Sequence, residues 1–268
     1  MENHVLDSVL PDIRSSFESD DRFRLFISHY DRLFSTHPQQ DKSAHQFTRI
    51  WKHSISQVLF LRSLLDHPAH FDLLSKLILK SDYFVDNLVR DPHLFSWLQN
   101  TQILTGSFSE ERMQKDGQRA ATGSDLRSTQ IQLLKQFHRK YTVAIGARDL
   151  LGLDSIRETT FYLSSLADCI LLHISEILNR EFFRDGIIPG FAIFALGKYG
   201  GRELNYSSDI DLIAVCENND ELEWRGRNLP VTDVLHRWIQ AFSDVIGQPD
   251  SDGYFYRVDF RLRPDGEF

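Results

Sequence analysis

The sequence predicts an α+β protein, in which an all-helical N-terminal region precedes an α/β domain with a mixed sheet. Apolar residues recur at helical spacing from about residue 5 to 100, a stretch without glycine. After residue 186, short apolar runs are bounded by glycine and proline, which indicates strands. The chain has 268 residues, 41% of them hydrophobic and 25% charged, so it is long enough for two units and excludes a disordered protein.

Residues 1–104 are predicted to form the helical region. Phe47, Ile50 and Trp51 show the spacing of one buried helix face. The pairs at 67–68 and 91–92 end in proline, and the residue before proline is pushed away from helical angles. We therefore expect helix ends at both places.

Residues 105–125 are polar, charged and contain glycine, which predicts a loop or mobile connector. A second helical segment is predicted over 126–185, leading into the next domain. Within it, Ser155 and Glu158 have the spacing of a capping box that opens a helix extending toward Asn179.

The α/β domain is predicted over 186–268. Strands are expected at 191–196, 211–215 and 254–262, and an amphipathic run predicts a helix at 231–246. The sequence shows no convincing internal repeat.

The net charge of −8 argues against a protein that binds nucleic acid through a broad basic face. Cys169 and Cys216 each lie in an apolar segment, so neither a disulfide framework nor a thiolate metal site is indicated. The N-terminus has no secretory pattern, and no stretch approaches the ~20 apolar residues of a spanning helix. We expect a soluble cytoplasmic protein without nucleic-acid or membrane partners.

A glycine-rich turn, 197–201, follows the first predicted strand. Small residues there let backbone N–H groups approach an anion, and a helix opening after the strand would add its dipole. A tight strand-to-helix connection accounts for the glycines equally well. The turn is not a P-loop, because Lys198 is followed by Tyr199 rather than Ser or Thr.

Two carboxylates stand two residues apart at the start of the second predicted strand. Period-two geometry places Asp209 and Asp211 on one face. Their mutual repulsion is relieved by a shared hard cation such as Mg²⁺. For an isolated Asp-x-Asp motif, a solvent-facing acidic pair remains the favoured alternative.

The third predicted strand changes that balance. Asp259, Arg261 and Arg263 alternate with apolar residues, which gives one charged face and one apolar face. Asp259 can complete a three-carboxylate metal site, while Arg261 or Arg263 faces phosphates with a guanidinium. A half-exposed strand with an ordinary acid–base ladder is the alternative.

These motifs are Gly-Lys-Tyr-Gly-Gly-Arg-Glu-Leu-Asn-Tyr-Ser-Ser-Asp-Ile-Asp-Leu (197–212) and Val-Asp-Phe-Arg-Leu-Arg-Pro-Asp-Gly (258–266). They resemble the signatures of the glutamine synthetase adenylyltransferase/adenylyl-removing family. A weaker resemblance covers 81–92 and 145–152, whereas little is visible in the first ~40 residues or the polar connector.

Family members resemble a tandem duplication, with a deadenylylating nucleotidyltransferase-fold domain in the N-terminal half and an adenylylating one in the C-terminal half. This chain resembles one copy. Because a helical region precedes the motif, the resemblance implies the adenylyl-removing half, which phosphorolyses AMP-tyrosine on glutamine synthetase to release ADP. It also implies that the domain at 186–268 is truncated.

The resemblance implies two Mg²⁺ ions, ATP or ADP and phosphate as substrates, and glutamine synthetase and a PII-type nitrogen signalling protein as partners. Asp209 and Asp211 are expected to bridge the ions, and Asp259 to hold one of them. The residues expected to bind nucleotide or phosphate are Gly200 and Gly201 through backbone N–H groups, Ser208, Arg261, Arg263 and, more weakly, Lys198.

Other readings stay open. A nucleotide-sugar glycosyltransferase and a haloacid-dehalogenase-like nucleophile are disfavoured by the glycine turn and by the polar residues before Asp209. A non-enzymatic alternative is a helical docking module whose attached unit is catalytically incomplete and binds nucleotide or a protein. His53, His138 and His236 lie in helical patterns without a second ligand at metal spacing, which favours core or surface histidines over zinc ligands.

Overall fold

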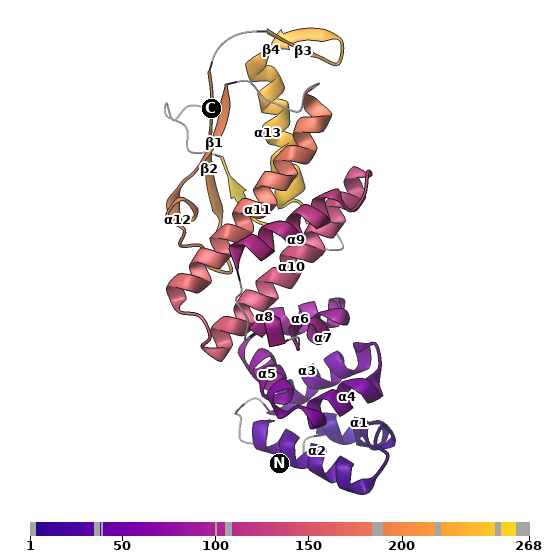
Figure 1. Ribbon diagram of the computed structural model, residues 1–268. Coiled ribbons are helices and arrows are strands. Elements are labelled where there is room, and N and C mark those ends of the chain that lie inside the picture. Colours follow the sequence, from indigo (N-terminus) through magenta and orange to yellow (C-terminus); the bar gives the residue numbers. More distant parts are fainter. Residues whose placement is uncertain are drawn as a thin grey trace. The chain divides into compact units, whose positions relative to one another are not determined.

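The computed structural model describes residues 4–34, 38, 40–99, 101–104, 109–183, 190–217, 221–249 and 253–260. The chain divides into two compact units. Unit 1 comprises Met1–Phe108 and Gly146–Leu153, and unit 2 comprises Ser109–Ile145 and Asp154–Phe268. Helices occur along the whole chain, while the strands lie in unit 2, so the predicted α+β class is confirmed (Figure 1).

Unit 1 is helical, as the sequence predicted for 1–104. Its helices are α1 (His4–Ser15), α2 (Asp20–Phe34), α3 (Gln40–His53), α4 (Gln57–Asp66), α5 (Pro68–Lys80), α6 (Asp82–Arg90), α7 (His93–Leu98) and α8 (Thr101–Leu104). The two prolines mark helix ends as expected, because His67 and Asp91 before them leave helical angles at φ −132° and −124°.

Aromatic side chains form the core of unit 1. Phe26 stacks on Phe71 with ring centroids 5.7 Å apart, and Phe47 packs edge-on against Tyr30 at 5.4 Å. These four side chains are at most 2% exposed. Burying an aromatic of this size contributes roughly 1.5–3 kcal/mol, so this cluster supplies much of the stability of the unit.

Packing and hydrogen bonds within unit 1 explain why a glycine and an arginine occur in the segment 145–152. A Cβ on Gly146, near the C-terminal end of helix α10 (Arg127–Leu151), would lie 2.3 Å from the ring of Phe84, so only glycine fits there. Nearby, Arg148 Nη1 donates to the carbonyls of Ile103 and Leu104, at 3.1 Å each. This guanidinium satisfies carbonyl groups at the end of α8.

The connector predicted over 105–125 was wrong for most of its length, because its central part forms helix α9 (Glu110–Thr122). Ser109 caps this helix, accepting a backbone N–H of the first turn at 3.2 Å. Gly117 is not a loop signal, since a Cβ there would lie 2.3 Å from the sulfur of Cys169 in helix α11 (Ile156–Phe182). Residues 105–108 lie outside the described part of the chain.

Helix α11 begins as predicted. Ser155 and Glu158 form the capping box, and the helix runs one turn beyond Asn179 to Phe182. By length and composition α11 is apolar enough to cross a membrane, which the sequence analysis did not anticipate. However, 67% of its apolar window is buried inside the protein, which is the environment of a core helix.

The elements that follow are β1 (Phe191–Ala195), α12 (Gly197–Gly200), β2 (Ile210–Cys216), β3 (Glu221–Trp224), β4 (Arg227–Pro230), α13 (Val231–Gly247) and β5 (Val258–Asp259). The sheet has the order β1-β2-β5, in which β1 runs antiparallel and β5 parallel to β2, so the predicted mixed sheet is confirmed. The helix expected at 231–246 is α13.

Two expectations for the strands need correction. Among the described residues the third strand is only two residues long, instead of extending over 254–262, and 261–262 lie outside them. The β3–β4 hairpin was not predicted. Its turn, Arg225-Gly226, has φ of +50° and +76°, values typical of a tight hairpin but unusual for arginine.

The sheet has two different faces. On one, Phe191 contacts Trp238 at 5.4 Å and Phe260 contacts Phe242 at 6.1 Å between ring centroids, so α13 covers this face (Figure 1). Ile210 lies on the same face and is fully buried. Because side chains alternate along a strand, the intervening residues point to the opposite face, where the predicted carboxylates lie.

Candidate functional site

The parallel pairing of β2 with β5 brings two of the predicted carboxylates together. Asp211 and Asp259 are direct Cα partners in the register. Paired residues on adjacent strands project to the same face, and strands lie ~4.8 Å apart. Their neighbours, Ile210 and Phe260, point toward the helix-covered face. Asp211 and Asp259 therefore form an acidic pair on the opposite face of the sheet.

The third predicted carboxylate, Asp209, is held by a residue that the sequence analysis missed. Arg257 Nε lies 2.7 Å from Asp209 Oδ1, and the Arg257 carbonyl accepts the Ile210 N–H at 2.8 Å. The arginine stands two residues before Asp259, so the alternation that pointed to Arg261 and Arg263 also contained the signal for Arg257. Both partners are more than half exposed, so the pair itself adds little stability.

The donor set at this edge fits a hard cation in its chemistry, because Mg²⁺ is bound through one or two carboxylates together with substrate oxygens. Among the described residues, however, no group of three or more Asp, Glu, His or Cys is placed to hold a metal ion. Asp209 is engaged with Arg257, which leaves Asp211 and Asp259 as the adjacent pair. The three-carboxylate ion site stays a prediction, and it requires Asp209 to leave Arg257.

The turn after β1 lies directly against Asp211. Gly197 has φ +55°, and a Cβ on it would lie 2.5 Å from Asp211 Oδ2. The Leu196 N–H also donates to the Asp211 carbonyl at 2.9 Å. Only glycine satisfies both the left-handed backbone and the contact with the carboxylate.

Gly200 and Gly201 were predicted to present backbone N–H groups to phosphate, a role that stays a prediction. Their N–H groups donate inside the turn, to Leu196 O at 2.9 Å and Gly197 O at 3.1 Å. A Cβ on Gly200 would lie 2.5 Å from the Ala195 carbonyl oxygen. The glycines are thus explained by a tight connection between β1 and α12, the alternative considered above.

The remaining predicted phosphate residues differ in their surroundings. Ser208 Oγ donates to Asn205 Oδ1 at 2.9 Å and accepts the Asn205 N–H at 3.0 Å, so it closes the loop before β2. Lys198 is exposed on α12. Arg261 and Arg263 lie outside the described residues, and the phosphate roles of all four residues stay predictions.

Helix α10 fixes the segment that leads into β5. Lys135 Nζ donates to the Gly253 carbonyl at 2.6 Å and lies 5.7 Å from the Phe255 ring centroid. His138 packs edge-on against Tyr256 at 4.8 Å and against Phe255 at 5.7 Å. The sequence did not reveal these contacts, which hold the chain immediately before Arg257 and Asp259.

This packing makes stability depend on pH. Burial lowers the pKa of His138 from 6.5 to about 3, and the charge of Arg139 adds to the shift. Below about pH 6.5 the unfolded chain takes up a proton that the folded chain does not. The contribution of His138 to the free energy of unfolding is therefore complete above pH 6.5 and should fall by roughly 1 kcal/mol per pH unit as the pH drops toward 3.

Urea denaturation of the protein and of His138→Gln, at pH values from about 7 to about 5, measures this contribution. The free energy of unfolding of the variant should lack the part of the pH dependence that His138 contributes, because glutamine does not titrate. Equal slopes in the two proteins would show that His138 takes up its proton in the folded state.

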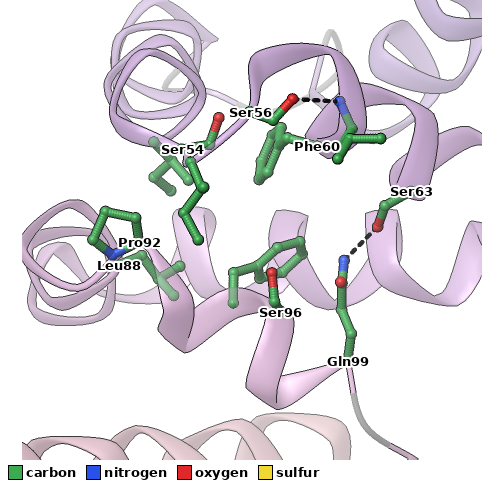
Figure 2. A pocket seen from close by; sticks show the side chains of 12 residues that line it. Ser54, Ser56, Phe60, Ser63, Leu88, Pro92, Ser96 and Gln99 are labelled. Atoms are coloured by element: carbon green, nitrogen blue, oxygen red, sulfur yellow. Dashed lines mark hydrogen bonds between the residues drawn. The ribbon is translucent and has the colours of Figure 1, made fainter.

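A separate cavity of about 300 Å³ lies in unit 1 (Figure 2). Phe60 and Leu88 are among its apolar lining, and Gln99 Nε2 donates to Ser63 Oγ at 2.6 Å on one side. None of the described residues that line it is titratable, so the cavity offers no acid, base or metal-binding carboxylate. The carboxylate pair Asp211 and Asp259 lies in unit 2, apart from the lining of this cavity.

Comparisons with known proteins show which proteins this chain is similar to. The family model of glutamate-ammonia ligase adenylyltransferase matches residues 71–268, which include the turn and all three aspartates. A bifunctional glutamine synthetase adenylyltransferase/adenylyl-removing enzyme from Psychromonas ingrahamii is 32% identical, over 72% of this chain and 21% of its own length. One of the same description from Ralstonia nicotianae is 26% identical, over 97% of this chain and 28% of its own length. The chain spans between a fifth and a third of these relatives.

Proposed function

Because this chain belongs to the glutamate-ammonia ligase adenylyltransferase family, we propose that its unit 2 carries a metal-dependent centre for adenylyl transfer on glutamine synthetase. The observation that carries the proposal is the register that pairs Asp211 with Asp259. It sets two carboxylates from distant parts of the chain side by side on the sheet face opposite α13. A divalent cation bound between them would offset the repulsion of two like charges held on adjacent strands.

In this proposal Asp211 and Asp259 hold Mg²⁺, and Asp209 joins them when it leaves Arg257. The ions supply charge neutralisation on the phosphoryl group. Arg257, once released, presents a guanidinium at the same edge of the sheet, where it suits a phosphate oxygen. Ser208, Lys198, Arg261 and Arg263 are the further proposed phosphate contacts.

The proposed direction is removal of the adenylyl group. Inorganic phosphate attacks the phosphorus of AMP-tyrosine on glutamine synthetase, the bond to the tyrosine oxygen breaks, and that oxygen takes up a proton as ADP leaves. The relatives' description names both adenylyl transfer and adenylyl removal, and the position of the helical region before the motif is what favours removal. A PII-type signalling protein as regulator and a cytoplasmic location are parts of the same proposal.

A second candidate function is a module that binds nucleotide or a protein without turnover. One observation favours it: among the described residues no group of three or more metal-binding side chains is assembled. The two candidates are distinguished by whether the chain turns over adenylylated glutamine synthetase or only binds nucleotide or a protein.

The test is release of ADP from adenylylated glutamine synthetase with Mg²⁺ and phosphate, comparing the chain with Asp209→Ala/Asp211→Ala. We expect release that depends on phosphate and disappears in the variant. Calorimetry with ADP and Mg²⁺ runs in parallel. If both proteins fold and neither releases ADP, while the unmodified chain still binds Mg²⁺-ADP, the binding module is the correct function.

A further inference from the structure

One carboxylate on helix α11 anchors the turn that abuts Asp211. Asp168 Oδ1 accepts the Tyr199 hydroxyl at 2.6 Å, and Asp168 Oδ2 accepts Arg202 Nη2 at 3.0 Å. Tyr199 and Arg202 stand on either side of the glycine pair. A single side chain therefore ties both flanks of the turn to the core helix of unit 2.

Two serines on the preceding turn of α11 add to this anchor. Ser165 Oγ accepts Arg202 Nη1 at 3.1 Å, and Ser164 Oγ accepts the Leu204 N–H at 3.3 Å. Both serines are fully buried. Their spacing of three and four residues from Asp168 places all three side chains on neighbouring positions of the helix surface. This polar stripe on an apolar core helix is explained by its bonds to the turn.

The turn needs such support because its backbone is unfavourable. Arg202 has φ +56°, a left-handed conformation that non-glycine residues rarely adopt. Its guanidinium also lies 5.1 Å from the Phe161 ring centroid, which adds a contact to the same helix. The bonds from α11 therefore stabilise a conformation that the local sequence disfavours.

The position of the turn determines the space around the metal-binding carboxylate. Asp211 Oδ2 lies 2.5 Å from the point where a Gly197 Cβ would stand. A displacement of the turn by a few tenths of an ångström would press on this carboxylate or open a gap beside it. Residues that orient a metal ligand in this way affect metal affinity without touching the metal.

We propose that Asp168 is a positioning residue that holds the turn 197–204 against Asp211 and thereby tunes the affinity of the Asp211–Asp259 pair for a divalent cation. The part concerning the cation rests on the proposed function. The part concerning the turn does not, and the two can be measured separately.

Exposure distinguishes this role from a merely structural one. The side chains of Asp168 and Arg202 are 37% and 47% exposed, and ion pairs this exposed contribute little to global stability. A structural role predicts a small loss of thermal stability and unchanged cation affinity. A positioning role predicts a large loss of affinity at nearly unchanged melting temperature.

The experiment compares Asp168→Asn with a matched control, Asp116→Asn. Asp116 also joins a tyrosine and an arginine, accepting the Tyr141 hydroxyl at 2.7 Å and Arg119 Nη1 at 3.0 Å, but it bonds to no residue of the turn. Tyr199→Phe removes one bond of the anchor and serves as a milder variant if Asp168→Asn folds poorly.

Beside the melting temperature, two readouts are taken on each protein: Mn²⁺ binding by electron paramagnetic resonance, and amide hydrogen exchange of peptides covering 197–211 by mass spectrometry. Asp168→Asn should raise the Mn²⁺ Kd about tenfold or more and speed exchange in the turn about tenfold. Tyr199→Phe should shift both in the same direction by less. Asp116→Asn should leave both at their original values.

Unchanged exchange in Asp168→Asn would overturn the proposal, and so would faster exchange with an unchanged Mn²⁺ Kd. If the unmodified chain binds no Mn²⁺, the proposed metal chemistry and the claim about affinity both fail. In that case the exchange data still decide whether Asp168 holds the turn.

Discussion

Asp211→Asn is expected to lower ADP release about a thousandfold and to abolish tight Mn²⁺ binding, while the fold stays intact. The physical reason is the position of Asp211, which pairs with Asp259 in the strand register and whose carboxylate lies against the turn at Gly197. Asparagine keeps the shape of the side chain but removes the negative charge that attracts the cation. The loss should therefore appear in both metal affinity and kcat.

The measurement is ADP release from adenylylated glutamine synthetase together with Mn²⁺ titration. Asp233→Asn is the matched control, because Asp233 is exposed in the first turn of α13 and has no place in the proposed site. Normal metal binding in Asp211→Asn would contradict the assignment. So would a loss confined to an Asp259 variant while Asp209→Ala and Asp211→Asn bind metal normally.

Gly197→Ala should produce the second-largest effect. Its methyl group would stand 2.5 Å from Asp211 Oδ2 on a backbone with φ +55°. The left-handed conformation alone costs an alanine about 1–2 kcal/mol, and the overlap forces Asp211 or the turn to move. We expect reduced stability and, because the carboxylate is displaced, at least about a tenfold weaker Mn²⁺ affinity.

Gly226→Ala separates the effect of backbone strain from the effect of the contact with Asp211. Gly226 also has a left-handed backbone, with φ +76°, but nothing lies within 4 Å of its Cβ position in the β3–β4 turn. This variant should lose a similar 1–2 kcal/mol from backbone strain alone and keep its Mn²⁺ affinity. Equal Mn²⁺ affinities in the two alanine variants would show that the contact of Gly197 with Asp211 has no role in cation binding. Urea denaturation supplies the stabilities.

Local rules accounted for much of the fold. The residues before Pro68 and Pro92 leave helical angles, and Ser155 with Glu158 caps α11, because these effects depend on backbone sterics and hydrogen bonds within a few residues. The same rules failed at α9. The glycine content of 105–125 predicted a loop, but at Gly117 the absent side chain makes room for Cys169, which is distant in sequence.

At the proposed site, the sequence by itself determined which residues share a face of a strand. The period of two along each strand put Asp209 with Asp211, and Asp259 with the arginines, on charged faces opposite apolar ones. That period is a local property of extended backbone, so it can be read without knowing the fold. It also contained Arg257, although no local rule assigned that arginine a partner.

Only the tertiary structure decided which of these residues meet. The parallel register of β2 and β5 sets Asp211 opposite Asp259 and brings Arg257 to Asp209, while the antiparallel pairing of β1 with β2 brings Gly197 against Asp211. The packing of α11 alone shows that Asp168 anchors the turn. Such contacts join segments far apart in the chain, and their geometry is fixed by strand pairing and core packing rather than by any spacing along the sequence.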